Sequence, residues 1–437
     1  MEHAHTPFRM WSKPVVGWAM FDFANTIFSF AVLTKYLNEW VTEDHHRPDW
    51  NIAVMLAIVG LLLVVIMPAL GAVSDQIGRR LPFLAAATMV CIAATAAIGF
   101  VSSVNTALVL AGVAVFGYQL SLSMYDPLLA VVAPEEHRGA VSGLGVGLGY
   151  VGVIVGAIVL LLIVGEGDKQ AAFLPTAVMF LVFSLPLLLW VKEHRHPSDA
   201  AGVTAEVTGA PPQVPVRSVM GDALKQLTRT VTHIRSDHRE VGRFLVARFL
   251  YVDALATVIG FMTVYMSRLG GFSELQKTLV SILAMIFGAA GAIVAGRVVE
   301  RVGPKRVLQT ILLFTTCVLV VASLTGSRNL VWVLGPAVGI TLGSVWTSDR
   351  VLMMRLSPPE VRGEFFGLYN LVGKISDGIG PLVLWSGTIY LLHNIRDWTI
   401  LDASRAALSM LALAVVGGWF VLRPVSDHVR YADDQFI

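Results

Sequence analysis

Charged residues are scarce in this 437-residue chain: Asp, Glu, Lys and Arg make up 14% of it, against about 25% in soluble globular proteins. Hydrophobic residues reach 55%, and the mean hydropathy is +0.70. This composition excludes a soluble enzyme, and the formal net charge of +2 gives no reason to expect a nucleic-acid partner. The sequence therefore predicts a protein that crosses a membrane several times.

Other absences limit the chemistry. The two cysteines, Cys91 and Cys317, lie inside apolar segments, so a disulfide framework is excluded. No phosphate-binding loop is present, which argues against transport driven by ATP hydrolysis within the chain. The adjacent His45 and His46 have no cysteines or carboxylates around them in a metal-site pattern. We therefore expect neither a metal nor a cofactor.

Twelve apolar windows are long enough to cross about 30 Å of hydrocarbon as helices rising 1.5 Å per residue. The first carries Asp22 and is too long for a signal-peptide core, so we predict that it is retained as a helix. The predicted fold is an all-α membrane protein of two six-helix bundles. The windows start near Val15, Asn51, Leu81, Thr106, Val141, Phe173, Phe244, Thr278, Val307, Leu330, Glu364 and Asp402.

The predicted domains are an N-terminal bundle (1–191), a cytoplasmic linker (192–243) and a C-terminal bundle (244–437). Within the linker, apolar residues recur at helical spacing from Met220 to Ile234, which predicts an amphipathic helix on the inner leaflet, a helix docked on protein being the alternative. If the N-terminus is cytoplasmic, about two thirds of the 32 Lys and Arg residues fall on the inner side. Both termini are therefore predicted to be cytoplasmic.

A ten-residue motif, Gly71 to Arg80, lies between two apolar windows, and a degraded copy runs from Gly296 to Lys305. Such a repeat indicates two duplicated halves. Asp75 can cap the positive end of a neighbouring helix, and a contact made in only one arrangement of the halves acts as a gate. Anchoring by positive charge explains the arginines but neither Asp75 nor Glu300. The predicted gate residues are Gly71, Asp75, Gly78, Arg79, Arg80, Arg138, Glu300 and Arg362.

The first and seventh helices both carry Asp-x-x-x-Thr, at Asp22 to Thr26 and at Asp253 to Thr257. This spacing places carboxylate and hydroxyl on one helix face. Since a carboxylate facing lipid is costly, these groups are expected to face the bundle interior or a water-filled cavity. A structural salt bridge is the competing interpretation. The predicted substrate-binding residues are Asp22, Asn25, Thr26, Asp253, Thr257 and Lys374.

At membrane depth we count five acids and three bases, so two carboxylates lack a cation. Desolvation disfavours the charged form of a carboxylate, which makes Asp126 the predicted proton carrier. Alternatively, Arg350 pairs with Asp126 permanently.

Lys374 and Asp377 are spaced to neutralise each other. Asp349 and Arg350 are expected to anchor the tenth helix. The acids are Asp22, Asp126, Asp253, Asp349 and Asp377, and the bases are Arg248, Arg350 and Lys374.

The motif from Gly71 to Arg80 resembles the signature loop of the major facilitator superfamily. Further segments resemble the branch that contains the autophagy-related vacuolar amino-acid effluxer and its bacterial relatives, although Asp126 stands where that branch usually has Asn. A sodium site of the design found in the similar glycoside and cation symporters is disfavoured, because residues 51–73 contain no acid. The segments that carry the resemblance are Gly17 to Thr26, Arg138 to Tyr150, Tyr251 to Asp253, Gly373 with Lys374, and Gly380 with Pro381.

This resemblance implies a secondary transporter in the bacterial inner membrane that exports a small polar metabolite, amino acids first, by alternating access. Proton coupling is expected from Asp126 rather than from the resemblance, and the protein is expected to be a monomer. Uptake or exchange of sugars or other organic solutes is the alternative within transport. A receptor or scaffold without flux is the alternative from another class. Intact acids in both halves argue against it, because a scaffold gains nothing from desolvated carboxylates.

Overall fold

The computed structural model describes residues 8–47, 50–164, 168–193 and 238–426. Within these ranges, 12 helices are long and apolar enough to cross a membrane, which confirms the predicted all-α membrane fold and its helix number. The predicted amphipathic segment from Met220 to Ile234 lies outside the described residues.

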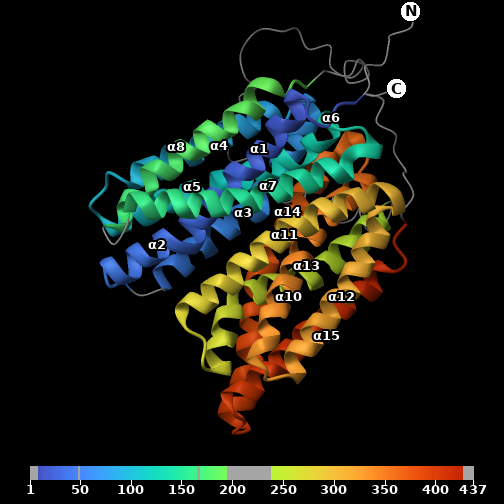
Figure 1. Cartoon of the computed structure of the whole chain (residues 1–437). Coiled ribbons are helices and arrows are strands. Elements are labelled where there is room, and N and C mark those ends of the chain that lie inside the picture. The colour runs from blue at the N-terminus through green and yellow to red at the C-terminus, as the bar shows by residue number, and fades with distance from the viewer. Residues whose placement is uncertain (1–7, 48–49, 165–167, 194–237, 427–437) are drawn as a thin grey trace, which may run out of the picture.

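The first six spanning helices form one half of the molecule, blue to green in Figure 1. Short helical turns continue α1 and precede α7: η1 (Ser29–Lys35), α2 (Tyr36–Glu39), η2 (Trp40–Asp44), η3 (Asp126–Leu128), α6 (Leu129–Val132) and η4 (Glu135–His137). A further turn, η5 (Lys169–Ala172), precedes α8. The long helices are α1 (Lys13–Phe28), α3 (Trp50–Ile77), α4 (Leu81–Ile98), α5 (Val104–Tyr125), α7 (Arg138–Val164) and α8 (Phe173–Trp190).

The second half, yellow to red in Figure 1, repeats this arrangement. Its first helix begins at Arg239 rather than near residue 244. The fifth, α14, runs into the π-helical segment η8 (Gly380–Gly387), which is followed by η9 (Tyr390–Ile395). The long helices are α10 (Arg239–Leu269), α11 (Glu274–Val302), α12 (Pro304–Leu324), α13 (Arg328–Leu356), α14 (Arg362–Ile379) and α15 (Ile400–Leu422), with the turn η7 (Pro359–Val361) before α14.

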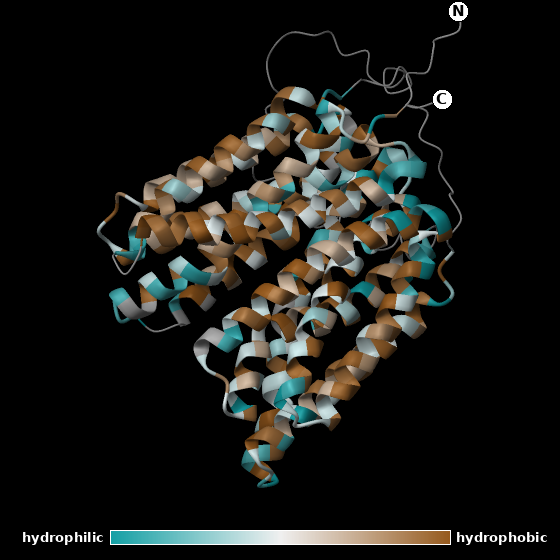
Figure 2. Ribbon diagram, viewed as in Figure 1, coloured by the Kyte–Doolittle hydropathy of each residue, from teal (hydrophilic) through white to brown (hydrophobic). Residues whose placement is uncertain are grey.

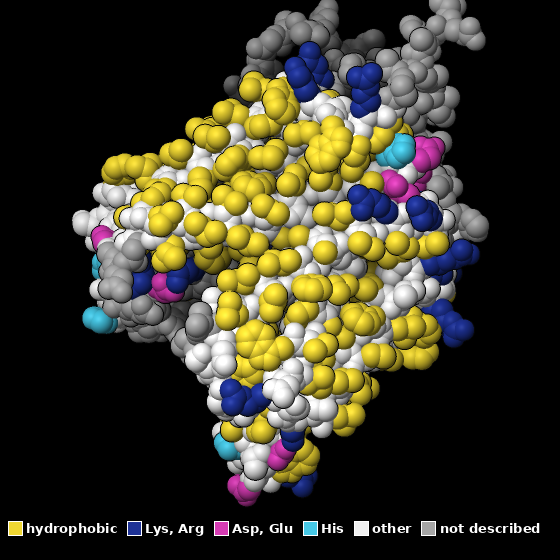
Figure 3. All heavy atoms as spheres, viewed as in Figure 1, with side chains coloured by type: hydrophobic (Ala, Val, Ile, Leu, Met, Phe, Trp, Pro, Cys, Tyr) yellow, Lys and Arg dark blue, Asp and Glu magenta, His cyan; other side chains and the backbone are white. Residues whose placement is uncertain are grey.

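The outer faces of the helices are apolar, as the brown ribbons of Figure 2 and the yellow surface of Figure 3 show. Leu162 is 80% exposed and Leu61 is 73% exposed, which is unfavourable in water and favourable against lipid tails. The burial pattern therefore agrees with a bundle whose surroundings are hydrocarbon.

The two halves meet mainly through α3 against α14 and α7 against α11. Both contacts need glycine: a Cβ atom on Gly71 would lie 2.5 Å from the carbonyl oxygen of Gly363, and one on Gly139 would lie 2.5 Å from that of Gly296. These glycines lie toward one end of the bundle, where α3 and α11 finish. We call this the motif end and the opposite one the far end. The outline of the molecule is indented between the halves at the far end (Figure 3).

Candidate functional site

A buried ion cluster joins the two halves. Arg350 of α13 lies with Nη1 3.3 Å from Oδ2 of Asp22 and with Nε 3.0 Å from Oδ1 of Asp126. Its guanidinium carbon is 5.2 Å from the ring centroid of Trp18 and 5.6 Å from that of Tyr125, within cation-π range. Asp22, Asp126 and Arg350 are 7%, 4% and 9% exposed. We call these five residues the central cluster, in which two carboxylates of the first half share one cation of the second.

The aromatic pair of the central cluster fixes α1 against α5. Trp18 donates from Nε1 to the carbonyl oxygen of Tyr125 at 3.3 Å, and the Tyr125 hydroxyl donates to the carbonyl oxygen of Trp18 at 3.0 Å. The rings stack with centroids 4.7 Å apart. On α7, Gly145 leaves the space they need, because a Cβ there would lie 2.7 Å from the Trp18 ring and 2.9 Å from Oδ2 of Asp22.

A second buried cluster lies beside the first, within the second half. Asp349 accepts from the Tyr369 hydroxyl at 2.9 Å and lies 3.3 Å from Nε of Arg248, whose guanidinium is 3.7 Å from the Tyr369 ring centroid. The next residue, Asn370, donates from Nδ2 to Oδ2 of Asp126 at 3.0 Å. Tyr369 and Asn370 are adjacent on α14, and they contact the second and the central cluster respectively. Asp349 and Arg350, adjacent on α13, are divided between the same two clusters. The expectation that this α13 pair only anchors a helix end missed these contacts.

The predicted substrate residues of α1 differ in their surroundings. Asn25 lies one turn after Asp22, is 2% exposed, and neither polar atom of its side-chain amide has a hydrogen-bond partner in the described part of the chain. The Thr26 hydroxyl instead donates to the carbonyl oxygen of Gly149 on α7 at 2.6 Å, and lies 3.1 Å from the Asp22 carbonyl oxygen. The Asn25 amide is therefore left without a partner among the described residues, whereas Thr26 packs α1 against α7.

Asp253 and Thr257 of α10 match Asp22 and Thr26 of α1, and they lie at the junction between α14 and η8. Asp253, 3% exposed, accepts at Oδ1 from the backbone N–H of Gly380 at 2.6 Å. The Thr257 hydroxyl is fully buried and donates to the Asp253 carbonyl oxygen at 2.7 Å. Lys374 is partly buried on α14, and the side chain of Asp377 lies outside the described part of the structure.

Two carboxylates at the motif end each cap a helix of the opposite half. Asp75, at the end of α3, accepts from the backbone N–H groups of residues 363 and 364 at 3.0 Å each, at the start of α14. Glu300, at the end of α11, accepts from the N–H of Ala140 at 3.1 Å, at the start of α7. Asp75 also lies 2.5 Å from Nη2 of Arg80 within its own half. The two caps are related by the exchange of the halves.

The other motif residues shape this contact. Gly78 has a φ of +66°, the left-handed conformation that glycine adopts without steric cost, and it turns the chain between α3 and α4. Gly71 packs on the backbone of Gly363, as described above. Arg79 is exposed at the motif end.

Arg138 and Arg362 occupy matching positions at the starts of α7 and α14, and they are only 2% and 4% exposed. Arg138 pairs with Glu135. Glu135 also lies 2.6 Å from Nε of Arg355 on α13, so this carboxylate bridges the halves. Glu135 and Arg355 belong to the motif-end contact although the sequence pattern did not single them out.

Comparison with known proteins supports the family that the motifs suggested. The sequence profile of the Major Facilitator Superfamily matches residues 15–381. An uncharacterized MFS-type transporter of Bacillus subtilis, YxiO, is 27% identical over 94% of this chain and 94% of its own. Autophagy-related protein 22-2 of Aspergillus clavatus is 26% identical over 59% of this chain and 45% of its own length. The crystal structure of the human organic anion transporter MFSD10 superposes with a TM-score of 0.69 at 16% identity, covering 93% of this chain and 97% of that one. The chain is therefore a multi-pass membrane protein and a secondary transporter that belongs to the Major Facilitator Superfamily.

Proposed function

We propose that this protein transports an amino acid by alternating access, with the substrate bound at the central cluster. The observation that carries the proposal is the contact of Arg350 with both Asp22 and Asp126 across the two halves. An amino acid bears one ammonium and one carboxylate. Its ammonium can replace the guanidinium on a carboxylate of the first half, which frees Arg350 to bind the substrate carboxylate in a bidentate manner.

Asn25 supports this site, because its buried amide offers a donor and an acceptor that the described structure leaves unused. Burying such a group without a partner costs about 1 to 3 kcal/mol, and a ligand that bonds to it recovers that cost. We assign substrate contact to Asp22, Asn25 and Arg350. Thr26 and Thr257 are assigned to helix packing, and Asp253 with Lys374 to the second-half wall of the site.

Asp126 is the proposed proton carrier. Arg350 and Asn370 both contact it in the present arrangement, and both belong to the second half. Rocking of the halves would withdraw the guanidinium and leave a desolvated carboxylate, whose neutral form is then favoured. A proton taken up in one state and released in the other would couple transport to a pH gradient.

The motif-end contacts form the proposed gate. The caps made by Asp75 and Glu300 exist only while the halves are closed at that end. We place this end in the cytoplasm of a bacterial cell, with the protein in the inner membrane, because exposed Lys and Arg side chains gather there (Figure 3). These cations include Arg79, Arg243, Arg297, Arg301, Arg306 and Arg423. The direction proposed, export, follows from the resemblance of α1 to the amino-acid effluxer branch.

A ligand screen tests the substrate class. The purified protein is heated with amino acids, sugars and nucleosides in turn, since a ligand that binds only the folded state raises the melting temperature by mass action. We expect an amino acid to stabilise the wild type and not the Asp22→Asn variant. Asp44→Asn, a change of the same charge at the surface carboxylate paired with Lys169, should respond like the wild type. Stabilisation by sugars alone would overturn the substrate assignment.

A further inference from the structure

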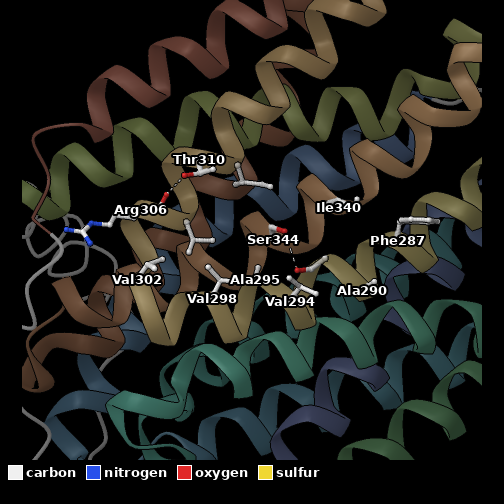
Figure 4. A pocket seen from close by; sticks show the side chains of 13 residues that line it. Phe287, Ala290, Val294, Ala295, Val298, Val302, Arg306, Thr310, Ile340 and Ser344 are labelled. Carbon is white, nitrogen blue, oxygen red and sulfur yellow. Dashed lines mark hydrogen bonds between the residues drawn. The ribbon is translucent and has the colours of Figure 1, made fainter.

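An apolar groove of about 390 Å³ runs along the outer surface of the second half, between α11, α12 and α13. Figure 4 shows α11 side chains along one wall, with Phe287 at one end and Arg306 at the other. On α11 the groove lies beside the Gly296 face that packs on the first half, and it does not include that face. It is lined by residues 287, 290, 291, 294, 295, 298 and 302 of α11, by 306, 307, 310 and 311 of α12, and by 340 and 344 of α13.

The walls of the groove suit a hydrocarbon chain. Phe287 is 41% exposed and Val294 is 57% exposed, on helices whose surroundings are lipid. Both hydroxyls in the lining are already used: Thr310 donates to the carbonyl oxygen of Arg306 at 2.9 Å, and Ser344 donates to that of Gly291 at 3.3 Å. Neither hydroxyl therefore has a proton left to donate to a ligand along the walls.

The mouth of the groove at the motif end is cationic. Arg306 is exposed, and no ion pair of its guanidinium occurs in the described ranges. It lies in the first turn of α12, which carries no acidic residue and whose N-cap, Gly303, has no side chain. The matching helix of the first half, α4, has its own anion, since Glu193 accepts from the backbone N–H groups of Arg80 and Leu81 at 2.8 to 2.9 Å. The positive end of α12 and Arg306 together favour an external anion.

We propose that this groove binds a phospholipid, with an acyl chain along α11 and an anionic headgroup at Arg306. The wall from Phe287 to Val302 is about 22 Å long at 1.5 Å per residue, more than half of the roughly 30 Å hydrocarbon core. A chain whose headgroup lies at the membrane surface beside Arg306 therefore extends past the middle of the bilayer. The charge at the mouth selects an anionic headgroup over a zwitterionic one.

The test compares lipid binding to purified wild type and four variants by native mass spectrometry and by thermal stabilisation. The probes are phosphatidylglycerol, phosphatidylcholine and inorganic phosphate. Arg306→Gln removes the proposed headgroup contact, and Ala290→Phe fills the groove without changing charge. Arg243→Gln and Ala86→Phe make the same changes at exposed positions of α10 and α4 outside the groove.

We expect the wild type to retain one phosphatidylglycerol in preference to phosphatidylcholine. In Arg306→Gln the preference for phosphatidylglycerol over phosphatidylcholine should be about fivefold smaller than in the wild type, because one cation near a membrane surface has an effect of that size. Ala290→Phe should lose the bound lipid of either kind, and the two controls should match the wild type. Should Ala290→Phe fail to fold, Ala290→Leu takes its place. An unchanged preference in Arg306→Gln, retention of lipid by the filled groove, or full stabilisation by phosphate alone would each overturn the proposal.

Discussion

Replacing Asp75 by asparagine tests whether the motif-end cap sets the balance between the two states of the transporter. Asparagine keeps one acceptor oxygen but loses the charge and one of the two bonds to residues 363 and 364. Losing a charged helix cap costs about 1 to 2 kcal/mol. The contact of Asp75 with Arg80 lies within the first half and is therefore present in both states. It does not contribute to the free-energy difference between the closed and the open state. The closed arrangement should therefore lose about 5- to 30-fold in relative population.

Cysteine labelling measures that shift. Ser142 is fully buried at the motif end, and its hydroxyl donates to the carbonyl oxygen of Thr347 in the other half at 3.2 Å. A Ser142→Cys reporter should react slowly in the closed state and faster, by the same 5- to 30-fold, when Asp75→Asn is added. Cys317 is exposed and has to be replaced first, whereas the buried Cys91 can stay.

A matched control separates the gate from simple loss of a cap. Glu193→Gln weakens a cap of the same chemistry, on the first turn of α4, but inside one half. It should lower the melting temperature and leave the labelling rate unchanged. Glu300→Gln, the reciprocal cap, should act like Asp75→Asn. Unchanged labelling in both gate variants would refute the reasoning.

Arg350→Gln should lower the free energy of unfolding by about 3 to 5 kcal/mol, because two buried carboxylates lose their cation; adding Asp126→Asn should recover part of the loss in thermal melts, and no recovery would show that the carboxylates are not the cause. Gly143→Ala places a Cβ 2.5 Å from the carbonyl oxygen of Ala292 and should open the motif end in the same labelling assay, whereas Gly260→Ala, with nothing within 4 Å, should not. In liposomes, Asp126→Asn should lose gradient-driven accumulation of substrate and keep exchange at equal pH; loss of both would count against proton coupling.

The helices were predictable because lipid imposes one simple rule, that every backbone group bonds within its own helix. Twenty apolar residues in a row therefore mean a helix, whatever lies beside it. The π-helical segments η1 and η8 were not anticipated, since they depend on local contacts such as the bond from Gly380 to Asp253. A hydropathy window contains no information of that kind.

The contacts within the central cluster were only partly predictable from the sequence. The alternative in which Arg350 pairs with Asp126 is the contact that the structure contains, and the clue was their matching position in the two halves. The burial of Asp22 was inferred correctly, but its neighbour Thr26 was assigned to the substrate by spacing alone. Spacing fixes a helix face, and it does not say whether that face meets a cavity or the carbonyl oxygen of Gly149.

The reciprocal caps at the motif end have a consequence for how such a gate evolves. Asp75 and Glu300 bond to main-chain N–H groups, which every residue except proline supplies. Side chains at 364 and 140 can therefore drift without breaking the contact, and only the glycine at 363 is constrained, by close packing. Pairs such as Arg350 with Asp126 should show correlated substitutions across homologues. The gate carboxylates should instead stay invariant without a covarying side chain among the backbone donors that they cap at 363, 364 and 140.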